Sequence, residues 1–296
     1  MSDILLPLHQ SPYLDAAEGV RALQNALVRR RTLVLSGAGL STDSGIPDYR
    51  SPERLKVPRK PMRYQMFVGS EAARKRYWAR SVVGWPHIAT AQPNDGHRAV
   101  AALEKRGVVS GVLTQNVDGL HQQAGTEEVL ELHGRLRSVI CLRCTQTEKR
   151  ERLQRRLLYC NPHFERFVDT PSEAPTIGVA PDGDADLPQE LIDSFEVPAC
   201  LRCGGVLKPD VVFFGENVPK ARVERAWQLL DEADALLVLG SSLTVFSGYR
   251  FVAKAAQTAK PVLIINQGAT RGDKDASLKL DAPLGDTLSA LAEVLT

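Results

Sequence analysis

The sequence predicts an α/β protein built on a doubly wound, Rossmann-like parallel sheet. Four short apolar runs are typical of strands buried on both faces, and they span 32–35, 108–113, 235–239 and 261–265. Segments with a helical spacing of apolar residues alternate with these runs, over 14–30, 97–105, 223–232 and 249–258. This alternation favours a parallel sheet with helices on both faces.

Each predicted strand ends in a polar or glycine-rich loop, which is where ligands bind in sheets of this kind. The first loop contains Gly37, Ala38 and Gly39, and glycines there let the backbone approach a pyrophosphate. Thr42 takes the place of the third glycine of the dinucleotide fingerprint, which disfavours a simple dehydrogenase. The later loops offer further polar groups at the same edge, namely Gln115, Asn116, Gly240, Ser241, Ser242, Asn266, Gln267 and Gly268.

Two segments interrupt the alternation and suggest further domains. Residues 51–96 are basic and punctuated by proline, which indicates a helical insertion or a lid near the cofactor loop. Residues 135–210 contain two C-x-x-C pairs, which indicate a small zinc-binding domain. We therefore assign 1–50, 97–134 and 211–296 to the large nucleotide-binding domain.

Four of the five cysteines form a predicted metal site. Cys141 and Cys144 make the first pair, and Cys200 and Cys203 make the second, with residues 145–199 as a long spacer. This spacing favours zinc held by four thiolates in a reducing compartment over disulfides. Four thiolates leave no open position for water, so we expect the zinc to be structural. Cys160 is expected to be an ordinary thiol.

Four polar side chains are candidates for chemistry, and two of them, His133 and Asp48, also have a structural interpretation. His133 stands before a glycine, and histidine is the side chain best suited to accept a proton near neutral pH, although a satisfied structural histidine is common. Asn116 and Asp118 follow a predicted strand, which favours the functional interpretation. Asp48 lies in a loop that could close over a cofactor, or it serves as a turn residue. His97 and His121 fall on predicted helices and are expected to be structural.

Taken together, these motifs resemble the sirtuin family of NAD-dependent protein lysine deacylases, from about residue 26 to 284. The resemblance rests on G-A-G-L-S with G-I-P-D-Y-R, T-Q-N-V-D-G-L-H, E-L-H-G, both C-x-x-C pairs, K-P-D-V-V-F-F-G-E, G-S-S-L and I-N-Q-G. Further segments, among them R-Y-W-A-R, A-P-D-G-D and S-G-Y-R-F, are most similar to the class II, sirtuin-4-like branch.

The resemblance implies NAD as cofactor, transfer of a lysine acyl group to ADP-ribose, and release of nicotinamide. It makes His133 the proton acceptor, with Asn116 and Asp118 as its catalytic partners. The residues implied to bind NAD are Gly37, Ala38, Gly39, Ser41, Ile46, Asp48, Tyr49, Arg50, Gln115, Asn116, Asp118, Gly240, Ser241, Ser242, Asn266, Gln267, Gly268 and Leu284. The residues implied to form a strand that binds the substrate backbone are Phe213, Phe214, Gly215 and Glu216, with Val212 against the lysine stem.

Tyr77 and Arg80 suggest an acyl-chain preference. At a spacing of i,i+3 they share one face of a helix, and arginine can bind a carboxylate through two hydrogen bonds. Sirtuins that remove succinyl or glutaryl groups use a Tyr-x-x-Arg pair for this purpose, so the resemblance implies a preference for carboxyl-bearing acyl chains. The alternative is a surface arginine on a basic helix. The spacer 145–199 is expected to reach the acyl channel and narrow it.

The net charge and the apolar runs of the chain limit the kinds of partner that we expect. A formal charge of +2 gives no reason to expect nucleic-acid binding, and no apolar run approaches the roughly 20 residues of a membrane span. We expect a cytoplasmic monomer that acts on acylated-lysine proteins or peptides. Mono-ADP-ribosyl transfer and a non-catalytic role in binding NAD or ADP-ribose remain alternatives, and a zinc-dependent hydrolase is disfavoured because all four ligands are cysteine.

Overall fold

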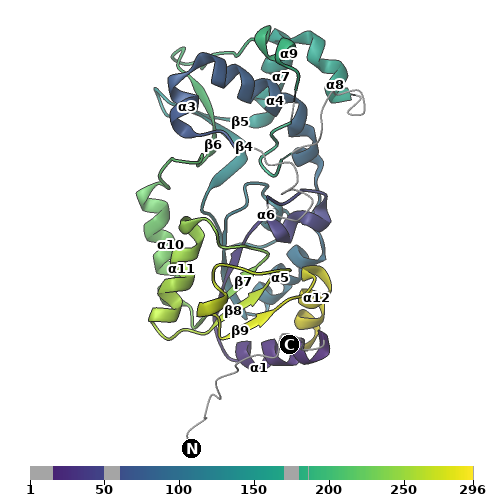
Figure 1. Ribbon diagram of the computed structural model, residues 1–296, viewed down its shortest axis with the longest axis vertical. Helices are drawn as coiled ribbons and strands as arrows, with labels where there is room; N and C mark the ends of the chain where they lie inside the picture. Colours follow the sequence, from purple (N-terminus) through teal and green to yellow (C-terminus); the bar gives the residue numbers. More distant parts are fainter. Residues whose placement is uncertain (1–15, 50–60, 170–179, 186, 296) are drawn as a thin grey trace, which may run out of the picture.

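Figure 1 shows the computed structural model, which describes residues 16–49, 61–169, 180–185 and 187–295. A large parallel sheet lies in the lower half of the molecule, and a smaller lobe with an antiparallel sheet lies above it. None of the described helices combines the length and apolar composition that a membrane crossing requires.

The large sheet confirms the predicted fold class. Its strand order is β3-β2-β1-β7-β8-β9, and every pairing in it is parallel. The four predicted strands are β1 (Thr32–Ser36), β2 (Val109–Thr114), β7 (Ala235–Leu239) and β8 (Val262–Ile265). The edge strands β3 (Val129–Glu131) and β9 (Leu278–Leu280) were not predicted, because three residues are too few to produce a recognisable apolar run.

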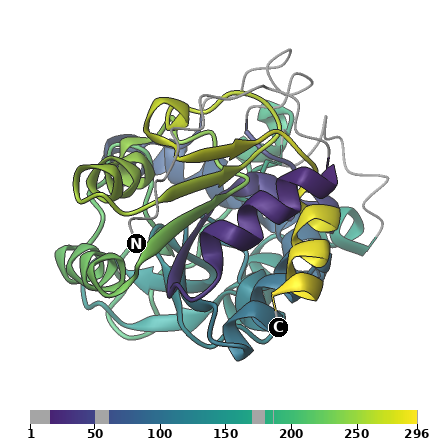
Figure 2. The same ribbon diagram turned by 90° about the horizontal axis from the view of Figure 1, so that it is seen from below.

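Side chains alternate between the two faces of the sheet, as the twofold repeat of a strand requires. On β1, Val34 packs with α1 (Ala16–Leu27), α5 (Asp95–Lys105) and α12 (Leu284–Val294). Its neighbours Leu33 and Leu35 pack with α10 (Lys220–Glu232) and α11 (Phe246–Gln257). Figure 2 shows the purple α1 and the yellow α12 on one side of the sheet and the green α10 and α11 on the other.

The smaller lobe is organised around a three-stranded sheet in the order β5-β4-β6. Its strands are β4 (Gly134–Cys141), β5 (Thr147–Lys149) and β6 (Leu207–Val211), and both pairings are antiparallel. The helices of the lobe are α3 (Tyr64–Gly69), α4 (Glu71–Thr90), α7 (Arg150–Cys160), α8 (Glu165–Asp169) and α9 (Gln189–Asp193).

Helices from 51–96 and elements from 135–210 share one hydrophobic core. Trp78 of α4 is fully buried in the same cluster as Leu153, Phe164 and Phe195. The two segments were predicted as separate units, because apolar periodicity within one segment does not reveal which distant segment covers it. The remaining short elements are α6 (Leu120–Gln123) and the 3₁₀ turns η1 (Ala38–Ser44), η2 (Pro162–Phe164) and η4 (Asp273–Asp275).

Element boundaries differ from the predicted ones by a few residues. The first helix ends at Leu27, and Arg29 beyond it has a left-handed φ of 62°, which ends helical geometry. The strand expected over Phe213–Glu216 is absent in this structure: β6 ends at Val211, and only an isolated bridge joins Phe214 to Arg63. Strand hydrogen bonds need a partner, and none of the described strands lies alongside this segment.

Candidate active site

A cleft of about 910 Å³ lies between the carboxyl edge of the large sheet and the smaller lobe. The loops after β1, β2, β7 and β8 form one wall, and the segment after β6 forms another. Most of the predicted site residues line it: Gly37, Ala38, Gly39, Ser41, Ile46, Asp48, Tyr49, Gln115, Asn116, Asp118, His133, Val212, Phe213, Phe214, Gly215, Glu216, Gly240, Ser241, Ser242, Asn266, Gln267 and Gly268.

Three predicted residues lie outside the cleft lining, and a fourth is not described. Leu284 is the first residue of α12 and packs behind the loop at Gly240 instead of lining the cleft. Tyr77 and Arg80 of α4 also lie outside the cleft lining. Arg50 lies outside the described residues.

The loops after β1 and β7 cross at very short range. The amide of Gly37 donates to the carbonyl of Leu239, and the amide of Gly39 donates to the carbonyl of Gly240, each at 2.9 Å. A Cβ at Gly240 would stand 2.5 Å from the amide nitrogen of Leu40, and the φ of Gly240 is +59°. Only glycine fits there, and the crossing exposes backbone where a pyrophosphate can approach.

Ser41 connects the two predicted catalytic partners. Its hydroxyl donates to Asp118 Oδ2 at 2.8 Å and accepts a hydrogen bond from Asn116 Nδ2 at 3.1 Å. The amide of Leu120 donates to the other carboxylate oxygen of Asp118 at 2.9 Å, and Asn116 Nδ2 also donates to the carbonyl of Gly37. Burial raises the pKa of Asp118. The network holds a polar cluster rigidly at the floor of the cleft.

Both ring nitrogens of His133 are engaged. Nδ1 lies 3.0 Å from the carbonyl oxygen of Gln115, and Nε2 lies 2.8 Å from the hydroxyl of Ser247. Because a carbonyl only accepts, Nδ1 carries the proton and Nε2 is the acceptor. Burial lowers the pKa of His133 to about 4, and the nearby Arg222 and Arg250 act in the same direction. His133 is therefore neutral near pH 7, with Nε2 able to accept a proton.

Gly134 allows His133 to reach the cleft. Its φ is +82°, and a Cβ there would stand 2.0 Å from the carbonyl oxygen of Asp210 on β6. His133 is also bound to the segment after β6, because the amide of Val212 donates to the carbonyl of His133 at 2.8 Å. The H-G dipeptide thus couples the proton acceptor to the segment after β6.

The segment after β6 is held by an ion pair between Lys208 and Glu216. Lys208 Nζ lies 3.0 Å from Glu216 Oε2, and the same oxygen accepts from the amide of Phe213 at 2.8 Å. Lys208 also donates to the carbonyl of Val211. Phe214 remains 42% exposed at the rim, so this segment presents both backbone and an apolar surface to the cleft.

Ser241 and Asn266 shape the nucleotide side of the cleft. The hydroxyl of Ser241 donates to Gln115 Oε1 at 2.6 Å and accepts from the amide of Leu243. Asn266 Nδ2 donates to the carbonyls of Gln267 and Gly268, which closes the loop after β8.

Tyr77 and Arg80 stand directly behind the cleft wall. The ring of Tyr77 contacts that of Phe213 at 5.2 Å between centroids, and Phe213 lines the cleft. Arg80 Nε lies 2.9 Å from Asp184 and donates to the carbonyl of Ala185 at 2.6 Å. Asp182, from the same short segment, lines the cleft. The spacer between the cysteine pairs therefore reaches the cleft, as expected from the sequence.

The four cysteines of the two C-x-x-C pairs form one cluster. Their sulfur atoms all lie within 4.8 Å of one another, with 3.5 Å between Cys141 and Cys203 and 3.8 Å between Cys144 and Cys200. Sulfurs bound to a tetrahedral zinc at about 2.3 Å are separated by roughly 3.8 Å. The donor set and its spacing fit a structural zinc ion, and they leave no position for a substrate.

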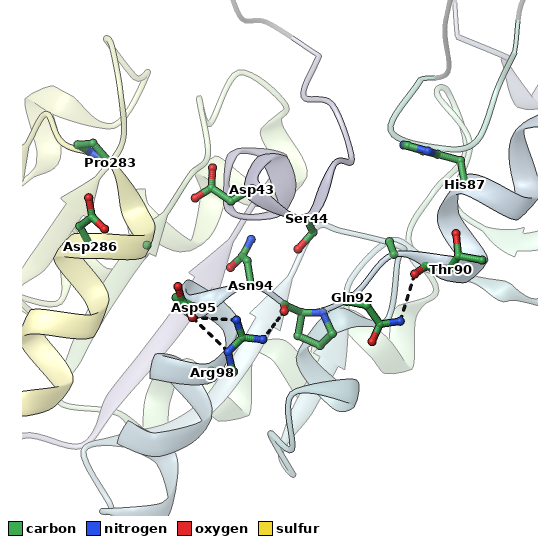
Figure 3. A pocket seen from close by; sticks show the side chains of 13 residues that line it. Asp43, Ser44, His87, Thr90, Gln92, Asn94, Asp95, Arg98, Pro283 and Asp286 are labelled. Atoms are coloured by element: carbon green, nitrogen blue, oxygen red, sulfur yellow. Dashed lines mark hydrogen bonds and ion pairs between the residues drawn. The ribbon is translucent and has the colours of Figure 1, made fainter. Parts of the chain in front are cut away.

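A second pocket lies behind η1, between α4, α5 and α12, and contains none of the predicted site residues (Figure 3). Its acidic groups include Asp95 and Asp286, in the first turns of α5 and α12, where carboxylates stabilise the positive end of a helix. Arg98 pairs with Asp95 at 2.8 Å. The charged side chains Asp95, Asp286 and Arg98 of this pocket are therefore explained by their interactions at helix ends.

Several residues that line the cleft were not predicted from the sequence, among them Ser247, Pro181 and Asp182. Ser247 lies in the first turn of α11, close to the end of β7, and polar residues following a strand of this sheet are natural candidates. Nothing in the sequence placed Pro181 and Asp182, because they belong to a long irregular segment whose path depends on tertiary contacts.

Comparisons with known proteins agree with this geometry. The family model described as "Sir2 family" matches residues 37–247. The chain is 54% identical to "NAD-dependent protein deacetylase 1" of Streptomyces coelicolor, over 97% of this chain and 95% of that relative. It is 46% identical to "NAD-dependent protein deacylase SIR4" of Monosiga brevicollis, over 95% and 90% of the two chains.

Solved structures show the same fold. A Sir2 protein with a p53 peptide and NAD+ matches with a TM-score of 0.70 and 28% identity, over 93% of this chain and 97% of that one. A Sir2 variant with a deacetylated p53 peptide and 3'-O-acetyl ADP ribose matches with a TM-score of 0.73 and 27% identity, over 94% and 99%. The family model and the curated relatives together show that this chain belongs to the Sir2 family.

Proposed function

We propose that the protein is an NAD-dependent protein lysine deacylase. The observation that carries the proposal is the placement of His133, with Nε2 as acceptor, in one cleft with the Asn116–Ser41–Asp118 cluster and the glycine crossing. The relatives named as NAD-dependent deacetylases and deacylases support it.

The loops of the large sheet would hold NAD. The backbone at Gly37, Ala38 and Gly39 and the hydroxyl of Ser241 would bind the phosphates, and Asn266 would bind the adenosine ribose. Asp48, Asn116 and Asp118 would line the nicotinamide pocket, and Gln115 would contact the nicotinamide ribose. The remaining members of the proposed cofactor set are Ser41, Ile46, Tyr49, Arg50, Gly240, Ser242, Gln267, Gly268 and Leu284. When bound, NAD supplies a ribose carbon that becomes electrophilic as nicotinamide departs.

His133 would act as the base of the reaction. Its neutral ring, held by the carbonyl of Gln115, keeps Nε2 oriented toward the cleft to accept a proton from a ribose hydroxyl. The buried polar cluster orients the reacting groups without solvent reorganisation, which is where most of the rate enhancement in such sites arises.

The acyl-lysine peptide would bind along the segment after β6. Phe213, Phe214, Gly215 and Glu216 offer backbone for β-pairing with an extended peptide, and Val212 packs against the lysine stem. A structural zinc held by Cys141, Cys144, Cys200 and Cys203 would fix the end of the small sheet where Cys141 of β4 pairs with Leu207 of β6, opposite the end from which this segment leaves.

We further propose membership of the class II, sirtuin-4-like branch and a preference for carboxyl-bearing acyl groups. The relative named deacylase SIR4 supports the branch. Tyr77 and Arg80 lie behind the cleft wall, so a carboxylate would reach Arg80 only by taking the place of Asp184.

Nicotinamide release from NAD tests the function, with acetyl-, succinyl-, glutaryl-, methylglutaryl- and lipoyl-lysine peptides. Release over many turnovers that requires one acyl peptide, and that is lost in His133→Ala, is expected. His163→Ala, an exposed histidine outside the cleft, is the matched control and keeps the activity. Release that proceeds equally without any acyl peptide, or its absence with every peptide, would contradict a deacylase.

A further inference from the structure

Ser247 of α11 contacts the ring of His133 inside the cleft. The hydroxyl of Ser247 lies 2.8 Å from Nε2, the ring nitrogen that must accept a proton. The other ring nitrogen is bound to the carbonyl of Gln115. The single lone pair of Nε2 is therefore occupied by Ser247, and a ribose hydroxyl cannot use it without either displacing the serine or passing its proton through it.

The backbone of Ser247 is held firmly in place. It lies in the first turn of α11, and its carbonyl accepts a hydrogen bond from Arg250 Nε at 3.2 Å. The next residue, Gly248, packs so closely on Gln115 that a Cβ there would stand 2.5 Å from Gln115 Nε2. Gln115 thus holds both the ring of His133, through its carbonyl, and the start of α11, through its side chain.

The surroundings of the pair oppose a free imidazolium ion. The positive end of the helix α11 lies beside Ser247, and Arg222 and Arg250 act on His133 with the same sign. A protonated Nε2 would therefore depend on an acceptor in direct contact, and Ser247 Oγ is the atom placed there.

We propose that Ser247 relays the proton from a ribose hydroxyl to His133, a step that rests on the proposed deacylase function. A serine hydroxyl can accept one hydrogen bond while it donates another. Ser247 Oγ would accept the proton of the ribose hydroxyl as that O–H bond breaks, and the electron pair left on the ribose oxygen would form the bond to the acyl carbon. The Ser247 O–H bond would break as its own proton passes to Nε2. The serine is restored, and His133 carries the positive charge.

Ser247→Ala tests the relay in the full-length enzyme, with Ser247→Thr as the variant that keeps a hydroxyl. Because the base acts after nicotinamide departs, exchange of labelled nicotinamide into NAD should persist in Ser247→Ala. Single-turnover deacylation should fall by roughly tenfold or more, and the KM for NAD should stay within about twofold. Ser247→Thr should recover most of the rate. Ser289→Ala, on α12 and outside the cleft, should match the wild type.

A proton inventory in mixtures of light and heavy water distinguishes a relay from a structural role. Two protons move together in the wild type, so the single-turnover rate should depend on deuterium content along a curve. One proton moves in Ser247→Ala, so the dependence should become linear. A linear dependence in the wild type, or a Ser247→Ala rate within about twofold of it, would overturn the relay.

The hydrogen bond between Ser247 and His133 Nε2 can be tested in the enzyme without substrates. In protein labelled with ¹⁵N-histidine, the Nε2 resonance of His133, assigned through His133→Ala, should move in Ser247→Ala and stay near its wild-type position in Ser247→Thr. An unmoved resonance would overturn the contact on which the relay depends. Wild-type enzyme that releases no nicotinamide would instead count against the deacylase function, and the resonance would still decide whether Ser247 holds Nε2.

Discussion

Arg80 on α4 forms an ion pair with Asp184, with 2.9 Å between Arg80 Nε and Asp184 Oδ1, and both side chains are more than four-fifths buried. The carboxylate thus comes from the protein's own spacer, from a segment that also lines the cleft through Asp182. If Arg80 recognises a carboxyl-bearing acyl chain, that chain and Asp184 would compete for the same guanidinium, and the pair would couple acyl selectivity to the position of the spacer.

Replacement of Asp184 should therefore change the acyl preference. In Asp184→Asn, the Arg80 guanidinium loses its anionic partner, and the ratio of kcat/KM for glutaryl over acetyl peptide should rise by about tenfold. Arg80→Ala should lower that ratio below the wild-type value. Asp193→Asn, an exposed acidic residue on α9, is the control and should leave the ratio unchanged. Equal effects of Arg80→Ala on both peptides would contradict a role for Arg80 in acyl recognition.

Gly134→Ala should destabilise the protein and abolish deacylation. The new Cβ would overlap the carbonyl oxygen of Asp210, and the left-handed φ is unfavourable for alanine, so the free energy of unfolding should drop by at least about 2 kcal/mol. Gly107→Ala is the matched control, because Gly107 has a φ of +75° with no neighbouring atom within 4 Å. It should cost about 1 kcal/mol and keep activity. Urea unfolding and peptide turnover measure both effects.

Removal of zinc should unfold the smaller lobe. Metal analysis of the purified protein should give about one zinc per chain, and chelation should lower Tm and abolish peptide binding, because the four thiolates would repel one another without the ion. Cys144→Ser should lose the metal. Cys160→Ser, which changes the cysteine outside the cluster, should retain it. A chain that keeps its Tm after complete removal of zinc would show that the metal is dispensable for the fold.

The sequence was sufficient to predict the large sheet, because each of its central strands is a continuous apolar run followed by a polar loop. It also predicted that Cys141, Cys144, Cys200 and Cys203 form one site, since the C-x-x-C spacing within each pair is a local pattern typical of zinc ligands. Contacts between distant segments were not predictable in the same way. Arg80 meets Asp184 and His133 meets Ser247 only because separate segments converge, and no local pattern shows which residues will pair. The predicted domain boundaries and the roles assigned to individual site residues stay predictions.

Acid should destabilise the fold through its buried histidines, of which His97 and His121 lie outside the cleft. His97 and His121 pack edge to face with 5.0 Å between ring centroids, and burial lowers their pKa values to about 4 and about 3. Unfolded histidine takes up a proton below its ordinary pKa of 6.5, whereas these two do not until well below it. The unfolded chain therefore binds more protons between about pH 6.5 and 4, and stability falls as the pH falls through that range.

Each of these histidines should contribute a slope of about 1.4 kcal/mol per pH unit to the free energy of unfolding. His121→Asn should remove one such contribution while it lowers the overall stability, and urea unfolding between pH 4.5 and 6.5 measures the slope. A variant with the wild-type slope would show that His121 titrates normally in the folded protein.

Ser41→Ala should lower kcat by disturbing Asp118 and Asn116. The substitution removes the donor to Asp118 and the acceptor for Asn116, and a hydrogen bond to a charged group contributes about 1.5–3 kcal/mol. Asp118, which is 4% exposed, would keep only the Leu120 amide among these donors, so its pKa should rise further. We expect kcat to fall by roughly tenfold or more, with its pH dependence shifted upward.

Ser44→Ala is the matched control on the same 3₁₀ turn. The hydroxyl of Ser44 is buried without a hydrogen-bond partner among the described residues, and it faces the second pocket instead of the cleft. Removing an unsatisfied hydroxyl costs little, so stability and kcat should stay near the wild-type values. If Ser41→Ala and Ser44→Ala reduced kcat alike, the effect would come from the turn as a whole. If Ser41→Ala alone reduced it without shifting the pH dependence, Ser41 would position Asn116 and have no influence on the charge of Asp118.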